Sequence, residues 1–128
     1  MAMWPKVSAT IEKTFTAIHS LNVAGGNSAK HGHEYVARFG FVHEVSPDGL
    51  AGSKALIDWE HGIDLCLAEV SGKDLNEVCA PYPPTIEILA IRMLSFLPAF
   101  FESVELSSYS PKYTVRVDRK GARIEWPA

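Results

Sequence analysis

Hydrophobic and polar residues alternate along the first part of the chain. Between Ser8 and Leu21 one parity carries Ile11, Phe15, Ala17 and His19, and the other carries Thr10, Glu12, Thr14 and Thr16. A period of two places successive side chains on opposite faces of a strand, so this stretch predicts a two-faced strand. Loop-forming asparagine, glycine and serine residues follow, and a second strand is predicted from about His31 to Val45. The two strands should pair as an antiparallel hairpin.

Two later segments have the three-to-four-residue spacing of helices. The first should begin at Asp58 and end near Val70, and its apolar stripe is Trp59, Ile63, Cys66, Leu67 and Val70. The second should run from Thr85 to about Leu97, because prolines precede its first turn and another proline follows its end. This second helix is apolar on more than one side, for which contact with another subunit is one explanation.

The C-terminal part again alternates as strands do. Strands are predicted over Val104–Tyr109 and Tyr113–Asp118, followed by a last short edge strand through Trp126. The order is therefore ββααββ with an extra edge strand, which is an α+β arrangement. With 128 residues, 47% of them hydrophobic, the chain is long enough for one core, and we expect residues 1–128 to form a single domain.

The composition argues against several classes of partner. The net charge is −3, the pI is near 5.9, and lysine and arginine are scattered, so the chain lacks the basic patch that a nucleic-acid partner requires. No long apolar stretch directs secretion or membrane insertion, and a cytoplasmic protein without a membrane partner is expected. In a reducing cytosol Cys66 and Cys79, which lack CxxC spacing, should be free thiols.

Three of the five histidines are placed so that they could meet. His31 and His33 are two residues apart on a predicted strand and therefore project from the same face. His19 ends the preceding strand and should lie beside them in the hairpin. Three neutral imidazoles with an open fourth position match a catalytic zinc site, but the spacing also allows three half-buried strand histidines bonded to backbone. His43 should be a solvated strand histidine and His61 a helix-surface one, with a role as a pocket base left open for His61.

Five segments, taken in order, resemble a known enzyme family. They are Phe15–His19, His31–Tyr35, Leu56–Trp59, Leu75–Asn76 and Pro84–Ala90. Their order and spacing look like those of the 6-pyruvoyl-tetrahydropterin and 6-carboxy-tetrahydropterin synthases, over a region from about residue 15 to residue 109. The resemblance implies a T-fold, an antiparallel four-stranded sheet with two helices on one face. It also implies zinc bound by His19, His31 and His33, a pterin-like ligand in an inter-subunit pocket, and a homohexamer of two stacked trimers.

The family's reactive positions are occupied here by residues without the matching chemistry. Asn27 stands four residues before the HGH sequence, where the family has a cysteine, and an amide can neither ionise nor abstract a proton. Ser71 and Gly72 stand where the resemblance places the family's Asp-His pair, if the Leu-Asn motif is the anchor. No catalytic triad can be assembled from these positions.

Four residues are candidates for contact with a ligand. Thr85 and Glu87 match the family's helix-start motif, and their structural alternative is an N-cap with a first-turn acid. The family glutamate that holds the pterin ring aligns with Ser108. Glu105 is the nearest carboxylate, but strand parity places it on the opposite face from Ser108, and a solvated strand glutamate is the alternative. Cys79 could be a relocated nucleophile, but nothing near it in sequence would lower its pKa.

These departures favour a divergent homologue that binds a pterin-like ligand and whose native reaction is unknown. The alternative is an active zinc-dependent carbon–oxygen lyase acting on dihydroneopterin triphosphate, with a base supplied by a neighbouring subunit. A purely structural oligomer fits less well, because the histidines are retained. Loss of the general base should slow the family reaction by a factor of about 10²–10⁴ or more.

Overall fold

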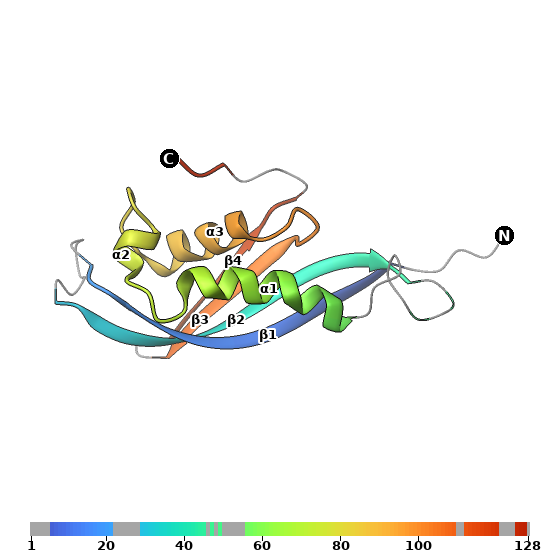
Figure 1. The fold of residues 1–128 in the computed structure, drawn as a ribbon, viewed down its shortest axis with the longest axis horizontal. Coiled ribbons are helices and arrows are strands. Elements are labelled where there is room, and N and C mark those ends of the chain that lie inside the picture. Colours follow the sequence, from blue (N-terminus) through green and yellow to red (C-terminus); the bar gives the residue numbers. More distant parts are fainter. Residues whose placement is uncertain are drawn as a thin grey trace.

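The structure is a computed structural model that describes residues 6–21, 29–45, 47, 49, 56–109, 112–120 and 125–127. Its sheet contains four strands, β1 (Lys6–His19), β2 (His31–Glu44), β3 (Ser103–Tyr109) and β4 (Lys112–Asp118). Neighbouring strands pair in the order β1-β2-β3-β4, and every pair is antiparallel. β1 and β2 form the long hairpin that the sequence predicts (Figure 1).

Helices cover one face of this sheet, as Figure 1 shows. The described residues form α1 (Leu56–Val70), the single turn α2 (Leu75–Val78) and α3 (Ile86–Phe96). α1 begins two residues before the predicted Asp58, a difference within the usual ambiguity of helix ends. The sequence pattern does not predict α2, because four residues are too few to show a helical period. None of the helices in the described ranges is long and apolar enough to cross a membrane.

The buried core lies between the helices and the inner face of the sheet. The alternation on β2 buries Tyr35, Ala37, Phe39 and Phe41. The helices contribute Ile63, Cys66 and Val70 from α1, and Leu89, Ala90, Met93 and Leu94 from α3. The three α1 residues belong to the apolar stripe predicted for that helix, and the predicted α+β class with two main helices on one face is confirmed.

The predicted last edge strand does not form over the described C-terminal residues. Residues 125–127 have no regular structure, and residues 121–124 of that prediction lie outside the described part of the chain. Instead, the Trp126 indole donates a hydrogen bond of 3.1 Å to the Ala80 carbonyl, and its ring lies against the Arg92 guanidinium, 4.6 Å from its carbon. Trp126 therefore makes its polar and cation–π contacts on the helical side of the molecule.

The hairpin is longer than the strand beside it. β3 pairs with β2 only from Tyr35 to Gly40, so the residues of β2 before Tyr35 continue past the last rung of that pairing. His31 and His33 lie in this overhanging end of β2, opposite the last residues of β1. The overhang leaves room beside these residues for segments other than β3.

Candidate metal site

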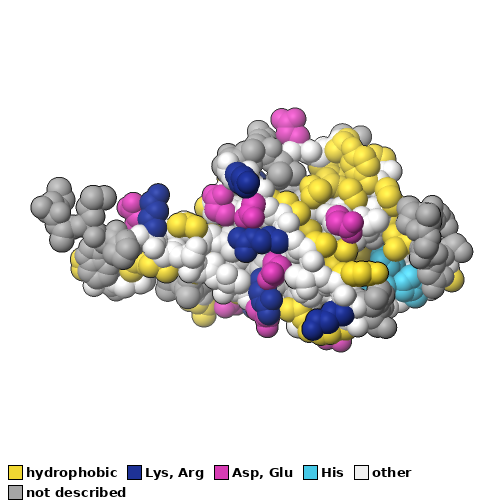
Figure 2. Space-filling view, turned by 180° about the vertical axis from the view of Figure 1, so that it is seen from behind, with side chains coloured by type: hydrophobic (Ala, Val, Ile, Leu, Met, Phe, Trp, Pro, Cys, Tyr) yellow, Lys and Arg dark blue, Asp and Glu magenta, His cyan; other side chains and the backbone are white. Residues whose placement is uncertain are grey.

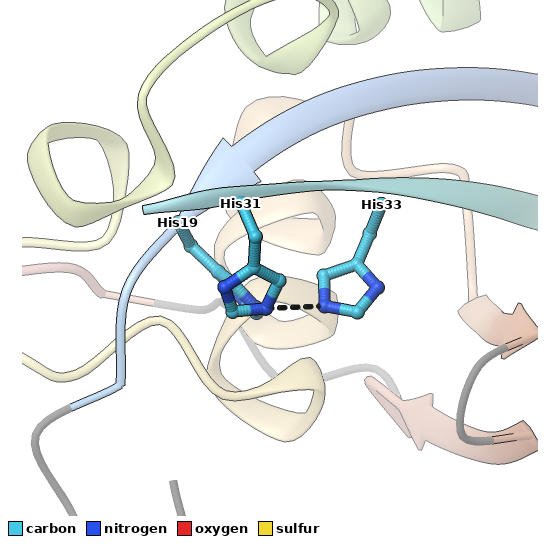
Figure 3. A group of neighbouring side chains, drawn as sticks. All are labelled: His19, His31 and His33. Carbon is cyan, nitrogen blue, oxygen red and sulfur yellow. Dashed lines mark hydrogen bonds between the residues drawn. The ribbon is translucent and has the colours of Figure 1, made fainter. Parts of the chain in front are cut away.

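The hairpin register places the three predicted ligands at one end of the sheet. His19 pairs directly with His31, and Ala17 pairs with His33. Because side chains alternate along a strand, these three histidines share the inner face of the sheet. Figure 3 shows the three rings pointing toward one another below the two strands. The sequence-based prediction that they come together is confirmed.

The ring nitrogens converge closely enough to bind one ion. The Nε2 atoms of His19 and His31 are 3.2 Å apart, and those of His31 and His33 are 2.8 Å apart. Each residue offers one ligand atom, and these atoms all lie within 4.8 Å of one another. Nitrogens bound tetrahedrally to zinc at about 2.0–2.1 Å should be separated by about 3.3 Å. The cluster therefore has the dimensions of a metal site and could hold a metal ion.

Two backbone carbonyls determine which nitrogen carries the proton in the rings of His19 and His31. His19 Nδ1 lies 3.1 Å from the Pro84 carbonyl oxygen, and His31 Nδ1 lies 2.9 Å from the Ala29 carbonyl oxygen. A carbonyl only accepts, so each neutral ring must carry its proton on Nδ1, and each Nε2 presents a lone pair. Two lone pairs 3.2 Å apart repel each other, whereas a cation between them would bind both.

The surroundings of the cluster favour neutral rings. Burial lowers the pKa of His19, and a positive charge on His33 would lower it further. Burial also lowers the pKa of His33, with His31 adding to the effect. A neutral imidazole is the form that binds metal, so the lowered pKa values favour metal binding over protonation of the rings. His31 and His33 are half-buried, and in Figure 2 histidine side chains reach the surface at one end of the molecule, so an ion could enter.

The start of α3 lies next to the cluster. Pro84, whose carbonyl contacts His19, directly precedes Thr85, the N-cap of α3. The Thr85 hydroxyl accepts a hydrogen bond of 3.2 Å from the backbone N–H of Ile88, and Glu87 is exposed in the first turn. Thr85 is thus the N-cap of α3, which is the alternative to ligand contact. Because Thr85 caps the helix, the Glu87 carboxylate remains available to bind a ligand.

The two candidates on β3 lie on opposite faces. Ser108 is buried and pairs with Tyr35, whose ring lies 5.9 Å from that of His33, so Ser108 faces the helices one strand away from the histidines. Glu105 lies on the outer face, where it accepts a hydrogen bond of 3.1 Å from Arg38. Glu105 and Ser108 thus face opposite sides, as strand parity predicts, and Glu105 does not join the histidine cluster within one subunit.

Two of the three positions that lack the expected chemistry are described, and both lie outside the histidine cluster. Asn27 falls outside the described residues. Ser71 is exposed after α1, and the Gly72 N–H donates a hydrogen bond of 2.7 Å to the Thr16 carbonyl on the edge of β1. Gly72 has φ +71, a conformation that favours glycine over other residues.

The remaining titratable candidates are separate from the site. His61 is exposed on α1, as predicted, whereas His43 is half-buried and lies beside the stacked rings of Phe41 and Trp59. The prediction of a solvated His43 is therefore wrong, because its odd parity on β2 turns it toward the helices. Both cysteines are free and buried, and burial raises the pKa of Cys66 to about 12 and that of Cys79 to about 11. Neither thiol is suited to act as a nucleophile.

Comparison with solved structures finds a protein with the same fold. The structure of Caenorhabditis elegans 6-pyruvoyl tetrahydropterin synthase is similar to this chain with a TM-score of 0.76 and 23% sequence identity. The likeness covers 92% of this chain and 99% of that chain. The chain has the T-fold. No protein-family model matches it, and no curated protein matches it in sequence. At this level of identity the comparison establishes the fold, while the site rests on the residues described above.

Proposed function

We propose that the chain is a divergent homologue of 6-pyruvoyl-tetrahydropterin synthase that binds zinc through His19, His31 and His33 and holds a pterin-like ligand beside the metal. The observation that carries this proposal is the pair of carbonyls that hold protons on Nδ1 and aim two Nε2 lone pairs at one point. Carbonyl partners of this kind orient the histidine ligands of known metal sites.

Zinc is the ion that this donor set favours. Three neutral nitrogen donors suit zinc, and no carboxylate of the described residues joins the cluster as harder ions would require. Three protein ligands leave a fourth position for a ligand oxygen, which the bound metal would polarise as a Lewis acid. The residues themselves contribute orientation: the Pro84 and Ala29 carbonyls hold the rings, and burial keeps His19 and His33 neutral.

The start of α3 supports a polar planar ligand next to this metal. Glu87 is an exposed acceptor in the first turn of α3, and Thr85 lies between it and the segment that contacts His19. An amino-pyrimidine edge presents N–H donors of the kind that a carboxylate binds in pairs. Ser108, on the same side of the sheet, is a further candidate, whereas Glu105 would require a pocket completed by another subunit.

The proposal excludes the standard synthase reaction, because Asn27, Ser71 and Gly72 supply no general base. The test is incubation with dihydroneopterin triphosphate followed by product chromatography, with pterin binding measured by calorimetry. We expect pterin uptake without turnover. Turnover near 1 s⁻¹ or faster, about the usual range for enzymes, would establish the alternative of an active zinc-dependent lyase. Absence of any pterin binding would disprove the ligand half of the proposal.

One variant tests whether the missing cysteine alone accounts for the expected lack of synthase activity. Asn27→Cys restores the thiol at the family's cysteine position but leaves Ser71 and Gly72 in place. We expect little recovery of synthase activity, because the members of a catalytic triad act as a unit. Recovery of most of the usual rate by this single change would show that the remaining positions are supplied from elsewhere.

The proposal includes self-association into a closed ring, expected as two stacked trimers. Within the described residues, β1 and β4 each have a strand neighbour on one side only, and residues 72–76 cover the other side of β1 near its end. The strands alternate in direction, so β4 of one copy can pair antiparallel with β1 of the next. Ring closure would pair the free backbone N–H and C=O groups of both edge strands, which otherwise promote aggregation.

A row of alternating charges on the outer face suggests the register of this pairing. Glu12, Arg38, Glu105 and Arg116 lie opposite one another on the four strands. Arg38 forms hydrogen bonds to Glu12 at 2.9 Å and to Glu105 at 3.1 Å. The row has an acid at the β1 edge and a base at the β4 edge, so joining Arg116 of one copy to Glu12 of the next would continue the alternation. Moving the register by two residues would instead place Asp118 or Thr114 opposite Glu12.

Cysteine pairs test the association and its register together. Glu12→Cys combined with Arg116→Cys would place two thiols on directly opposed residues, about 5.5 Å apart at Cα, which a disulfide can span. We expect covalent oligomers from this pair and not from Glu12→Cys with Thr114→Cys or Asp118→Cys. Cross-linking of one of the other pairs instead would show that the strands pair in a different register. A monomer in light scattering at micromolar concentration would disprove the ring.

A further inference from the structure

The segment between α1 and α2 lies along the outer edge of β1 at its histidine-bearing end. The Gly72 N–H donates to the Thr16 carbonyl at 2.7 Å, and the Ile18 N–H donates to the Lys73 carbonyl at 3.1 Å. Ile18 and Asp74 form a parallel bridge. This short segment therefore acts as an additional strand over the last residues before His19.

The side chain of Asn76 extends this pairing by one residue. Its Oδ1 accepts a hydrogen bond of 2.8 Å from the Ser20 N–H, and its Nδ2 donates one of 3.0 Å to the Ser20 carbonyl. The amide thus pairs with both backbone groups of Ser20, as another strand would. Ser20 is only 8% exposed and directly follows His19, at the point where the pairing between β1 and β2 ends.

Asp74 connects the same turn to the other histidine strand. Its Oδ1 accepts a hydrogen bond of 3.0 Å from the Asn76 N–H, which caps α2, and its Oδ2 is paired with the Lys30 ammonium group. Lys30 directly precedes His31. One turn of the chain therefore contacts the residue after His19 and the residue before His31.

We infer that Asn76 is a positioning residue for the metal site, with Asp74 supporting it. This inference rests on the proposed metal binding and adds what holds the ligands in place. The β1–β2 ladder ends at the pair of His19 and His31, so the ladder alone does not restrain the backbone beyond them. The Asn76 amide supplies that restraint from a turn whose neighbour Leu75 is fully buried. Supporting partners of this kind affect metal affinity by about 10–100-fold when removed.

The test compares metal binding in Asn76→Ala with binding in Glu77→Ala, which truncates an exposed side chain in the same turn. Zinc affinity is measured by competition with a chelator, and cobalt is used as a spectroscopic probe of coordination. We expect affinity to fall about 10–100-fold in Asn76→Ala, with a weaker or shifted cobalt absorption band, and to be unchanged in Glu77→Ala. An Asn76→Ala protein with the wild-type affinity and cobalt spectrum would overturn the inference.

A second variant covers the case in which Asn76→Ala does not fold. Asn76→Asp keeps an oxygen that accepts from the Ser20 N–H but faces the Ser20 carbonyl with another acceptor. We expect a folded protein with an affinity between those of the wild type and Asn76→Ala, and wild-type affinity in a folded Asn76→Asp would contradict the inference. Absence of metal binding by the wild type would instead reject the proposed function itself, together with the inference that rests on it.

Discussion

Zinc should stabilise the folded protein, and the histidine cluster should account for all of the effect. An ion that binds only the folded chain adds about 2.7 kcal/mol to the free energy of unfolding when its free concentration is 100 times Kd. For a chain of 128 residues this corresponds to a rise in Tm of about 10 °C. One ligand nitrogen from each histidine lies within 4.8 Å of the others, so binding should require little rearrangement of the strands, which favours a low Kd.

Thermal unfolding followed by circular dichroism, with and without zinc, measures the effect. The comparison is the triple variant His19→Ala, His31→Ala and His33→Ala at the same protein concentration. His61→Ala is the matched control, because His61 is an exposed histidine outside the cluster. We expect the shift in Tm to disappear in the triple variant and to persist in the control. An equal shift in all three proteins would mean that zinc binds elsewhere and would refute the assignment of the site.

Three further predictions concern stability. Because burial lowers the pKa of His19 and His33, the unfolded chain takes up more protons below about pH 6.5, so the free energy of unfolding of the metal-free protein should fall as the pH drops through that range. Urea titrations should show a flatter pH dependence when both are replaced by asparagine, and an unchanged slope would contradict this. Arg119→Met should cost about 2–4 kcal/mol in urea titrations, because buried Arg119 donates hydrogen bonds of 3.0 Å to the Leu94 and Phe101 carbonyls, and a cost near zero would contradict this. Gly40→Ala should cost about 1–3 kcal/mol, because its Cβ would lie 2.3 Å from Ser103 Oγ, and a smaller cost in a Ser103→Ala background, measured by a double-mutant cycle, would verify that contact.

The hairpin and its histidines are the part of the site that the sequence predicts best. Alternation over β1 and β2 indicates the buried face, and two-residue spacing puts His31 and His33 on it together. A symmetric hairpin then brings His19 opposite His31 without any information from the rest of the chain. Such predictions succeed because a strand's side-chain period is fixed by backbone geometry and does not depend on tertiary contacts.

Other parts of the structure depend on contacts that no local pattern contains. The four-residue turn α2 has no helical period of its own, and Trp126 packs against Arg92 rather than continuing a strand. His43 has the same parity as the buried residues of β2, but its stacking with Trp59 requires knowing where α1 lies over the sheet. Polar residues in particular are assigned to solvent when only their type is considered, although a neighbouring ring can cover them.

The orientation of the metal site depends on segments far from the hairpin. The Pro84 carbonyl that fixes the proton of His19 is 65 residues away in sequence, and Asn76, which holds Ser20, is 56 residues away. A hairpin alone can bring three imidazoles near one another, but it does not select the Nδ1 proton of His19 or restrain the backbone that follows it. Both tasks are performed by α2 and the segment that follows it, which pack into the core through Leu75 and Cys79. The sequence therefore identifies the candidate ligands, while the packing of the helical layer determines how their nitrogens are oriented.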